Sequence, residues 1–422
     1  MDVLEIEGPV RLDGTVHVSG SKNAALPIMA ATLLAPGESV IEQVPRLADI
    51  AVLGQLLQSL GARVERDGAD IHIDATRIDH PVGEYDIVRK MRASICILGP
   101  LLARCGRAKV SMPGGCAIGD RPVDIHLRGL RALGAQIHLE NGYIVATVPP
   151  GGLRGGPIFL GGPFGSTVLG TANVMMAATL AQGRTIIESA ACEPEIADLA
   201  ACLNAMGAKV HGIGSPRLVI DGVTRLTPVR HRVIGDRIEA GTFLVAAGLT
   251  GGRLTLTNCQ PDNMVAVVDR LAHIGVVVEP RDDGCVVRRS GELRPADVTT
   301  QPYPGFPTDL QAQFMAMLAL AEGNSVITEK VFPDRFMHVA ELNRMAANIR
   351  KEGPCAIVAG VRELIAAPVM ASDLRASAAL VLAGLAAWGK TVVHRVYHID
   401  RGYERIEEKL NAAGARIVRK DL

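Results

Sequence analysis

SLGARVERDG, residues 59–68, is the first of six variants of one phrase that recurs along the chain. The others are ALGAQIHLENG (132–142), AMGAKVHGIG (205–214), HIGVVVEPRDDG (273–284), MAANIRKEG (345–353) and AAGARIVRK (412–420). In each, a small residue follows an expected helix, and β-branched residues after it predict a short strand. The small residue recurs every 68 to 73 residues, at Gly61, Gly134, Gly207, Gly275, Ala346 and Gly414. A regular period of this length indicates a repeated structural unit.

A second shared phrase lies upstream of the first. It reads helix, glycine, strand, loop and helix, as in LLAPGESVIEQVPRLADI (33–50) and LAQGRTIIESAACEPEIADL (180–199). The glycine suits the left-handed position that ends a helix, and the branched residues after it suit a strand. Each unit of about 70 residues therefore combines two helices with several strands, which predicts an α/β fold.

Two assemblies of six such units are compatible with the repeat: a solenoid, or two closed groups of three. The chain ends favour the second. The sixth unit stops at ARIVRKDL (415–422) without the hairpin partner that the others have, and VLEIEG (3–8) predicts a spare strand with no helix before it. We infer that the N-terminal strand completes the last unit. The expected domains are residues 1–20 plus 233–422, and residues 21–232. The test is whether residues 3–7 pair with the C-terminal third.

Composition limits the classes of function. The 422 residues are 48% hydrophobic but only 3% aromatic, and 44 basic residues equal 44 acidic ones. A neutral balance argues against general binding to nucleic acid or a membrane surface, but permits a local basic pocket for a small anion. No signal peptide or apolar run of membrane-spanning length is visible. Eight cysteines without repeated CxxC spacing predict a cytoplasmic protein with reduced thiols.

One unit departs from the repeat. From Gly106 to Gly134 it spans 28 residues, against 23 to 25 in the other units, and the excess contains PGGCAIGDRP (113–122). Functional groups concentrate in loops carried by a rigid scaffold, although an ordinary surface loop is the alternative. Cys116 lies near Arg121, which favours thiolate, and near Asp120, which opposes it. By contrast Cys96, Cys202 and Cys355 stand in apolar context and are expected in the core.

Two glycine-rich segments suit anions. SGSKNAALP (19–27) places Lys22 at the start of an expected helix, and GGPFGSTVLGTANVMMAATL (161–180) is a glycine-rich loop that opens another. Glycine turns without a ligand are the alternative. The Ser19-x-x-Lys22 spacing also occurs in penicillin-binding serine enzymes, but the SDN and KTG motifs of that class are missing from the sequence.

Charged residues at expected helix starts are further candidates. Asp309 precedes a helix, where it suits either an N-cap or a catalytic base. Arg375 and Arg401 each stand beside an aspartate, with a local ion pair as the alternative. His394 and His398 are expected on one face of a strand without a third ligand, so no metal site is predicted.

Six ordered motifs carry a resemblance that spans nearly the whole chain. They are GSKNAALP (20–27), MRAS (91–94), MPGGCAIGDRPVD (112–124), FPTDLQAQF (306–314), DLRASAALVLAG (373–384) and YHIDRGYERIEEKL (397–410). Together they resemble the enolpyruvyl transferase family, in particular its UDP-N-acetylglucosamine 1-carboxyvinyltransferase branch. The resemblance implies an inside-out α/β barrel fold in two domains, each of three repeated units, which agrees with the repeat count.

The resemblance also implies a reaction. The enolpyruvyl group of phosphoenolpyruvate would move to the 3′-hydroxyl of UDP-N-acetylglucosamine with release of phosphate, by addition and elimination through a tetrahedral ketal, in the first committed step of peptidoglycan synthesis. Cys116 is then the proton donor, able also to form a covalent phosphoenolpyruvate adduct, and no other cofactor is expected. Asp309 matches the base toward the hydroxyl. Lys22 and Arg401 complete the expected catalytic set.

Binding residues follow from the same motifs. For phosphoenolpyruvate the expected contacts are Lys22, Asn23, Arg121, Arg401, and Arg375 with Asp373. For the sugar nucleotide they are Arg92, Arg121, Pro122, Val123, Asp124, Ile125, Asp309 and Val331. The family's diphosphate segment reads Ser-Val-Gly-Ala-Thr, whereas this chain has TVLGT (167–171), with Leu169 in the place of a glycine. The matching contacts are Ser166, Thr167 and Val168.

Three alternatives remain open from the sequence. A transferase that makes 5-enolpyruvylshikimate-3-phosphate shares the fold and donor, but would lack the loop cysteine and carry more basic residues. A non-catalytic paralogue that binds nucleotide sugars would not need Cys116 and Asp309. A repeat scaffold for protein partners would leave the anion-suited positions unexplained. The expected partners are the two small-molecule substrates, with no nucleic acid and no membrane, and the expected state is a monomer.

Overall fold

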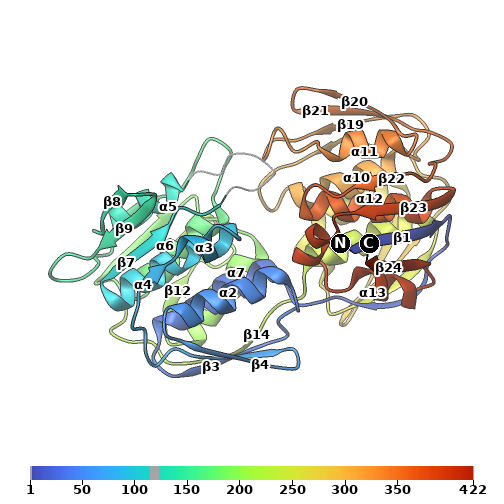
Figure 1. Ribbon diagram of the computed structural model, residues 1–422. Coiled ribbons are helices and arrows are strands. Elements are labelled where there is room, and N and C mark those ends of the chain that lie inside the picture. Colours follow the sequence, from blue (N-terminus) through green and yellow to red (C-terminus); the bar gives the residue numbers. More distant parts are fainter. Residues whose placement is uncertain (1, 115–122, 422) are drawn as a thin grey trace. The chain divides into compact units, whose positions relative to one another are not determined.

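The computed structural model describes residues 2–114 and 123–421, which form two compact units (Figure 1). We call residues 2–19 with 235–421 the C-terminal unit, and residues 20–114 with 123–234 the central unit. The chain therefore passes between the units after residues 19 and 234, where the sequence places the passages near 20 and 232. Among the described residues, no helix is long and apolar enough to cross a membrane.

The central unit contains three sheets of four strands with one shared order. In each, a first strand runs parallel to the second, and the third and fourth follow antiparallel. The sheets are β14 (Arg230–Arg232), β3 (Glu38–Glu42), β5 (Asp70–Asp74) and β4 (Arg63–Asp67); β6 (Val82–Gly83), β7 (Arg107–Ser111), β9 (Tyr143–Thr147) and β8 (Gln136–Glu140); and β10 (Pro157–Phe159), β11 (Arg184–Glu188), β13 (Arg217–Asp221) and β12 (Lys209–His211).

The C-terminal unit repeats this order three times. Its sheets are β2 (Asp13–His17), β15 (Arg253–Thr257), β17 (Gly284–Arg289) and β16 (Val276–Arg281); β18 (Val298–Thr299), β19 (Asn324–Thr328), β21 (Cys355–Ala359) and β20 (Asn348–Glu352); and β22 (Pro368–Met370), β23 (Gly389–His394), β1 (Asp2–Gly8) and β24 (Ile417–Asp421). Only the last sheet takes its third strand from the other end of the chain.

Strand β1 closes the C-terminal unit as the sequence predicts. It lies between β23 and β24 and is antiparallel to both, with Leu4 opposite Val393 and Val3 opposite Lys420. Leu4 and Ile6 are fully buried. The strand supplies the partner that the sixth unit lacks in sequence, so the three units form a closed group rather than the end of a solenoid.

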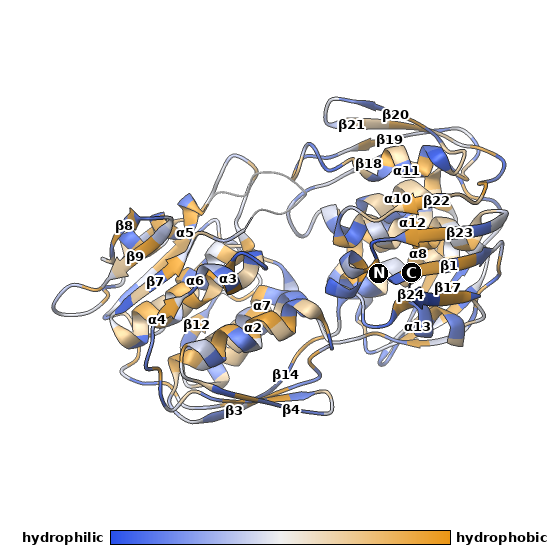
Figure 2. Cartoon of the chain, viewed as in Figure 1, coloured by the Kyte–Doolittle hydropathy of each residue, from blue (hydrophilic) through white to orange (hydrophobic). Residues whose placement is uncertain are grey.

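Helices fill the interior of each unit. The central helices are buried on nearly every side, because alanine, glycine and other small residues let neighbouring backbones approach closely. In the central unit they are α1 (Lys22–Ala31), η2 (Arg92–Ile97) with α4 (Leu98–Cys105), and α6 (Val168–Ala178). In the C-terminal unit they are α8 (Arg237–Thr250), η4 (Thr308–Leu310) with α10 (Gln311–Leu318), and α12 (Leu374–Ala386). Figure 2 shows α10 and α12 mainly in white and orange, whereas the edge strand β20 is largely blue.

The remaining helices include six with one exposed face, one for each repeat. They are α2 (Ala48–Ser59), α5 (Asp124–Ala132), α7 (Pro194–Ala205), α9 (Val265–Ile274), α11 (His338–Arg344) and α13 (Ile406–Ala412). Short connecting helices are η1 (Thr32–Leu34), α3 (Tyr85–Val88), η3 (Pro261–Met264) and η5 (Val396–Arg401). With helices inside and sheets outside, each unit has the inside-out barrel arrangement that the resemblance implies.

Glycine is required at both passages between the units. A Cβ atom at Gly20 would lie 1.9 Å from the carbonyl oxygen of Gln43, and one at Gly235 would lie 1.9 Å from that of Asn258. Beside them, the Ser21 N–H donates to the Ile234 carbonyl at 2.7 Å, and the Asp236 N–H donates to the Ser19 carbonyl at 2.8 Å. The path of the chain into both central helices α1 and α8 is thereby fixed.

We expect Leu4→Ala to lower the free energy of unfolding of the C-terminal unit by about 2–5 kcal/mol, because it empties a fully buried site in the closing strand. Urea unfolding measures this, followed by circular dichroism and by fluorescence of Trp388, the single tryptophan. Val418→Ala is the matched control, since Val418 lies in the adjacent strand β24 but is 54% exposed. Equal effects of the two substitutions would contradict closure by β1.

Candidate active site

The three central helices of the C-terminal unit each have an aspartate at the start. Asp236 caps α8 and accepts hydrogen bonds from the backbone N–H groups of Ile238 (2.8 Å) and Glu239 (3.1 Å). Asp373 caps α12 in the same way, accepting from Arg375 (2.7 Å) and Ala376 (2.9 Å). Both carboxylates satisfy backbone donors and oppose the positive end of a helix dipole.

Asp309 occupies the third helix start but has a different role. It lies inside η4, whose N-cap position is Pro307, so the N-cap alternative from the sequence is wrong. Its side chain is 29% exposed, whereas those of Asp236 and Asp373 are each 4% exposed. Of the three carboxylates, that of Asp309 is therefore the one that is partly accessible to solvent.

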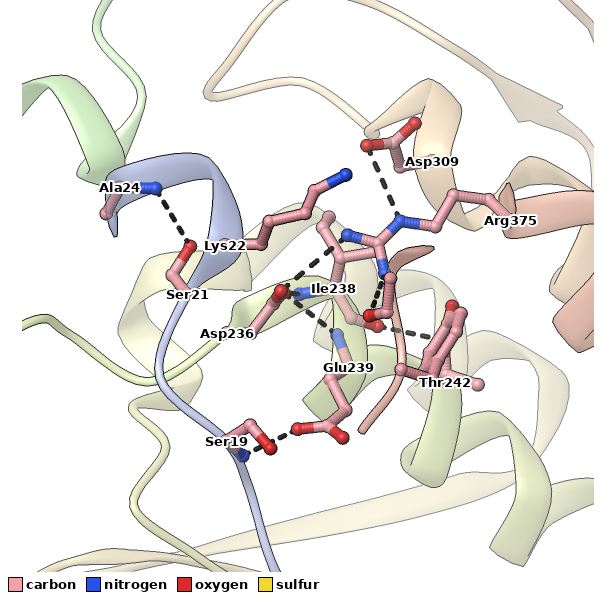
Figure 3. A network of polar contacts seen from close by, with 12 residues as sticks. Ser19, Ser21, Lys22, Ala24, Asp236, Ile238, Glu239, Thr242, Asp309 and Arg375 are labelled. Carbon is pink, nitrogen blue, oxygen red and sulfur yellow. Dashed lines mark hydrogen bonds and ion pairs between the residues drawn. The ribbon is translucent and has the colours of Figure 1, made fainter. Parts of the chain in front are cut away.

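Two buried arginines flank the Asp309 carboxylate. Nη1 of Arg335 donates to Asp309 Oδ1 at 2.8 Å, and Nε of Arg375 lies 3.8 Å from Asp309 Oδ2. Figure 3 shows the Arg375 guanidinium between Asp309 and Asp236, whose Oδ2 is 3.6 Å from Arg375 Nη2. The aspartates come from three different repeats, so the ion pairs join the starts of all three central helices.

Electrostatics keep these groups charged. Burial alone lowers the pKa of Arg375, but Tyr403, Asp236 and Asp309 reverse this and raise it above its ordinary value. Burial also opposes the charged form of Asp373, because it raises the pKa of the carboxyl. Arg335 and two backbone N–H groups outweigh this effect and leave the pKa below its ordinary value. Breaking a buried pair of this kind leaves an uncompensated charge and costs about 3–5 kcal/mol.

A polar chain supports Asp309 from behind. The Gln313 side chain donates to the Asp309 carbonyl oxygen at 3.0 Å and to the Tyr403 hydroxyl at 3.2 Å. That hydroxyl also lies 2.9 Å from the Thr242 hydroxyl. Arg375 stacks over the Tyr403 ring, 5.0 Å from its centroid, and burial raises the pKa of the Tyr403 phenol. The Tyr403 phenol therefore stays neutral, and these contacts hold its ring in a fixed position.

Glu329 brings the expected nucleotide contact Val331 to the same region. Its carboxylate accepts hydrogen bonds from the Thr308 hydroxyl at 2.9 Å and from the backbone N–H groups of Val331 (2.8 Å) and Phe332 (2.9 Å). Because Thr308 precedes Asp309, this single carboxylate ties the segment after β19 to η4. Asp309, Val331, Asp373 and Arg375 therefore lie in one cluster of the C-terminal unit.

Arg401 and its histidine neighbours differ in part from expectation. Arg401 is the last residue of η5 rather than the start of a helix, and the next residue, Gly402, accepts from Arg375 Nη1 at 3.4 Å. His394 ends β23 but His398 lies in η5, because Arg395 between them takes a left-handed backbone conformation (φ 59°). Burial and the charge of Arg401 lower the pKa of His398. No group of three or more His, Cys, Asp or Glu in residues 2–114 and 123–421 is arranged to hold a metal ion.

Lys22 belongs to the central unit. It is the first residue of α1, which Ser21 caps by accepting from the Ala24 N–H, and it is only 8% exposed. Its Nζ donates to Asp49 Oδ2 at 3.2 Å. Asn23, next to it, is half-buried. The expected start of an alanine-rich helix at Lys22 is confirmed.

The expected nucleotide contacts of the central unit stand at three helix starts. Arg92 begins η2, Val123 precedes α5 with Asp124 and Ile125 as its first residues, and Ser166 and Thr167 precede α6, which starts at Val168. Thr167 caps α6 by accepting from the Gly170 N–H at 3.2 Å.

Asn173 ties these three helix starts together from inside the central unit. Its side chain accepts from Gly99 N–H, donates to the Ile95 carbonyl and lies 3.0 Å from His126 Nδ1. These contacts join α6 to η2, α4 and α5. The segments that carry the three sets of expected contacts are therefore linked through one buried amide.

The structure describes three of the four cysteines for which the sequence gives an expectation. Cys116, with Arg121, Pro122 and Asp120, lies outside the described residues. Burial raises the pKa of Cys96 and Cys202 to about 12, which makes both inert core thiols as expected. Cys355 is only half-buried, so the expectation that it lies in the core is wrong. It is the first residue of β21 and lies on the partly open face of that strand, near the Thr328 hydroxyl.

Arg335 is one of the residues that the sequence did not single out. It stands in PDRFM (333–337), which has the composition of an ordinary loop. Its side chain is nonetheless only 6% exposed and contacts two of the three helix-start aspartates. An arginine between a proline-containing turn and an aromatic residue was the only available signal.

Comparisons with known proteins give matches along nearly the whole chain. Residues 6–410 match the family model of EPSP synthase (3-phosphoshikimate 1-carboxyvinyltransferase). A relative from Methylacidiphilum infernorum (isolate V4), named UDP-N-acetylglucosamine 1-carboxyvinyltransferase, is 55% identical over 419 residues, 99% of each chain. A relative of the same name from Anaeromyxobacter sp. (strain Fw109-5) is 55% identical over 423 residues and covers 100% of both chains.

Solved structures agree as well. The enolpyruvyl transferase NikO from Streptomyces tendae superposes with a TM-score of 0.89 at 26% identity over 99% of both chains. An EPSP synthase from Acinetobacter baumannii has a TM-score of 0.76 at 20% identity over 100% of both chains, which supports the fold alone.

We expect buried His338 to make the protein less stable in mild acid. It is 1% exposed, and burial lowers its pKa to about 4. The charge of Asp373 raises this pKa and that of Arg335 lowers it. The unfolded chain has an ordinary histidine pKa of about 6.5, so it binds the proton first as the pH falls. Between pH 7.5 and pH 5 this histidine should therefore remove about 2 kcal/mol of stability.

Urea unfolding at the two pH values measures this loss. In His338→Leu the loss should shrink by that amount, whereas the exposed control His80→Gln should keep the loss of the wild type. An unchanged loss in His338→Leu would contradict the lowered pKa.

Proposed function

Because the chain belongs to the UDP-N-acetylglucosamine 1-carboxyvinyltransferases of the EPSP synthase family, we propose that it transfers the enolpyruvyl group of phosphoenolpyruvate to the 3′-hydroxyl of UDP-N-acetylglucosamine and releases phosphate. This is the first committed step of peptidoglycan synthesis. The structural observation that carries the proposal is the Asp309 carboxylate. It lies at a helix start without capping the helix, and two buried guanidinium groups flank it.

The reaction needs two proton transfers in opposite directions. In the addition step, the sugar hydroxyl loses its proton and its oxygen bonds to C2 of phosphoenolpyruvate, while C3 gains a proton and becomes a methyl group. In the elimination step, the bond between C2 and the phosphate oxygen breaks, phosphate leaves, and the methyl group returns one proton. The site must therefore supply a base near the hydroxyl and an acid near C3.

Asp309 suits the base. Two guanidinium groups next to it favour its ionised form, which can only accept a proton. The cost of this arrangement is a weaker base, because the same cations stabilise the carboxylate. Charges that are fixed before the substrate binds need no rearrangement during the reaction, which lowers the barrier.

We assign the binding of phosphoenolpyruvate to basic residues of the chain. The Lys22 ammonium at the start of α1 donates to the buried Asp49 carboxylate, which favours the charged form of the lysine. We propose that this ammonium binds the phosphate or carboxylate of phosphoenolpyruvate. We assign Asn23, Arg121 and Arg401 to the same ligand. Arg375 is 3% exposed and engaged with Asp236 and Asp309, so we propose that it contributes mainly through the field it places at Asp309.

We assign the sugar nucleotide to the helix starts of the central unit. The N-termini of η2, α5 and α6 offer backbone N–H groups and positive dipole ends, which suit a diphosphate. From the resemblance we assign Arg92, the segments 121–125 and 166–168, Asp309 and Val331 to this ligand. Leu169 is the second residue of α6, so the substitution of the family's glycine lies inside the helix rather than in the turn before it.

Cys116 is assigned the proton donor to C3, and it can also hold a covalent adduct in which its sulfur bonds to C2. No cofactor enters the proposed reaction. The proposal includes action as a monomer in the cytoplasm on two small molecules, without nucleic acid or membrane. The related transfer to shikimate-3-phosphate is the second candidate, supported by the matching family model but not by the 55% identical relatives.

Phosphate release with each acceptor tests the proposal. We expect release from phosphoenolpyruvate to require UDP-N-acetylglucosamine, with shikimate-3-phosphate inactive. Release only with shikimate-3-phosphate would support the second candidate, and release with neither would support a protein that binds without turnover.

Cys116→Ser tests the donor in the same assay. We expect a loss of about 10²–10⁴-fold in turnover with sugar-nucleotide affinity retained, because a hydroxyl is a poor proton donor. Cys116→Asp, which restores an acid, should recover part of the rate. Full activity in Cys116→Ser would remove the cysteine from the mechanism.

A further inference from the structure

The carboxylate next to Arg401 is held by an arginine of the C-terminal strand. Asp400 precedes Arg401 in η5, and both of its oxygens accept hydrogen bonds from Arg419 of β24. Arg419 Nη2 donates to Asp400 Oδ1 at 2.7 Å, and Nη1 donates to Oδ2 at 3.0 Å. Two parallel hydrogen bonds between charged groups fix the orientation of both side chains. The end of η5 is therefore tied to β24.

We propose that Arg419 is a positioning residue for Arg401: through Asp400 it holds the end of η5 in the place from which Arg401 binds phosphoenolpyruvate. The inference deepens the proposed function and rests on the assignment of Arg401 to that substrate. The wild-type assay with both substrates therefore comes first, so that failure of the function is distinguished from failure of this inference.

Arg419 is itself anchored by two further carboxylates. Its Nε donates to Glu407 Oε1 of α13 at 2.6 Å, and its Nη1 donates to Asp2 Oδ2 of β1 at 3.1 Å. The Arg419 side chain is 27% exposed and that of Glu407 is 10% exposed. One guanidinium thus joins β1, η5 and α13. The ammonium of a lysine is a point charge and cannot form the paired hydrogen bonds with Asp400 while it holds the other two carboxylates.

The backbone after Arg401 is fixed from inside the unit. Gly402 packs so closely on the start of α12 that a Cβ atom there would lie 2.2 Å from a methyl carbon of Leu374. Tyr403 is 1% exposed, and its hydroxyl lies 2.9 Å from the Thr242 hydroxyl. Arg401 therefore has a fixed neighbour on its C-terminal side, whatever happens to Asp400.

The N-terminal side of Arg401 depends more on Asp400. The chain enters η5 through Arg395, which is exposed and has a left-handed backbone conformation (φ 59°). The six residues of η5 form a 3₁₀ helix, whose hydrogen bonds have poorer geometry than those of an α-helix. Without Arg419, fewer molecules would hold Arg401 in the binding position. The apparent affinity for the ligand of Arg401 falls in proportion to that fraction.

The first test compares the KM values of the two substrates. We expect Arg419→Met and Arg419→Lys each to raise the KM for phosphoenolpyruvate by about tenfold, because both substitutions lose the paired hydrogen bonds to Asp400. The KM for UDP-N-acetylglucosamine should stay within a few fold of the wild type. A general loss of structure would instead affect both substrates.

The second test is a double-mutant cycle with Asp400→Ala. This substitution removes the carboxylate but leaves Arg419 its contacts with Glu407 and Asp2. If Arg419 acts through Asp400, the single substitutions and the double variant should each raise the KM for phosphoenolpyruvate by about tenfold. Independent effects would multiply to about a hundredfold in the double variant.

Lys420→Met is the matched control. Lys420 is the next residue of β24, and its Nζ lies 2.8 Å from Glu5 Oε2, so it ties the same strand to β1 without a contact to η5. We expect the KM for phosphoenolpyruvate in Lys420→Met to equal that of the wild type.

Three results would overturn the inference. They are a wild-type KM for phosphoenolpyruvate in Arg419→Lys, an equal rise of both KM values, and multiplied effects in the double variant. If Arg419→Met does not fold, Arg419→Lys takes its place in the cycle, and the same outcomes decide.

Discussion

The buried ion cluster at the starts of α8, α10 and α12 is the constraint on which the C-terminal unit depends. Arg375 lies between Asp236 and Asp309, and Arg335 lies between Asp309 and Asp373. Charges in such a place are stable only when each has its partner. The cluster therefore fixes three helices relative to one another, and the same contacts fix the one carboxylate that remains partly exposed.

The repeat explains why such a cluster can form. Each unit of the repeat contributes one central helix and one sheet, and closure by β1 makes the three units of this domain equivalent neighbours. Equivalent positions at three helix starts then meet at one end of the helices. Two of the three aspartates do the ordinary work of caps. The third, Asp309, lies in a 3₁₀ turn in front of its helix and stays partly exposed.

The sequence predicted the architecture well because the relevant signals are local or periodic. Glycine after a helix, branched residues in a strand and a spare strand at the N-terminus all follow from short-range rules. Long-range pairing was harder to predict. Arg375 stands beside Asp373 in sequence, yet its ion pairs are with Asp236 and Asp309, which come from other repeats. Arg335 carries no motif, and only the fold brings its loop to η4. His398 lies outside the expected strand, because Arg395 takes a left-handed backbone conformation directly after β23.

The account's central claim is that Asp309 accepts the proton of the sugar hydroxyl within this cluster. Asp309→Asn keeps the shape of the side chain but removes the base, so its rate of product formation in a single turnover in D₂O tests the claim directly. The account predicts that the wild type places deuterium on C3 of the enolpyruvyl product. It predicts that Asp309→Asn binds UDP-N-acetylglucosamine within a few fold of the wild type but forms product about 10²–10⁴-fold more slowly. Product formation by Asp309→Asn at the wild-type rate would contradict it.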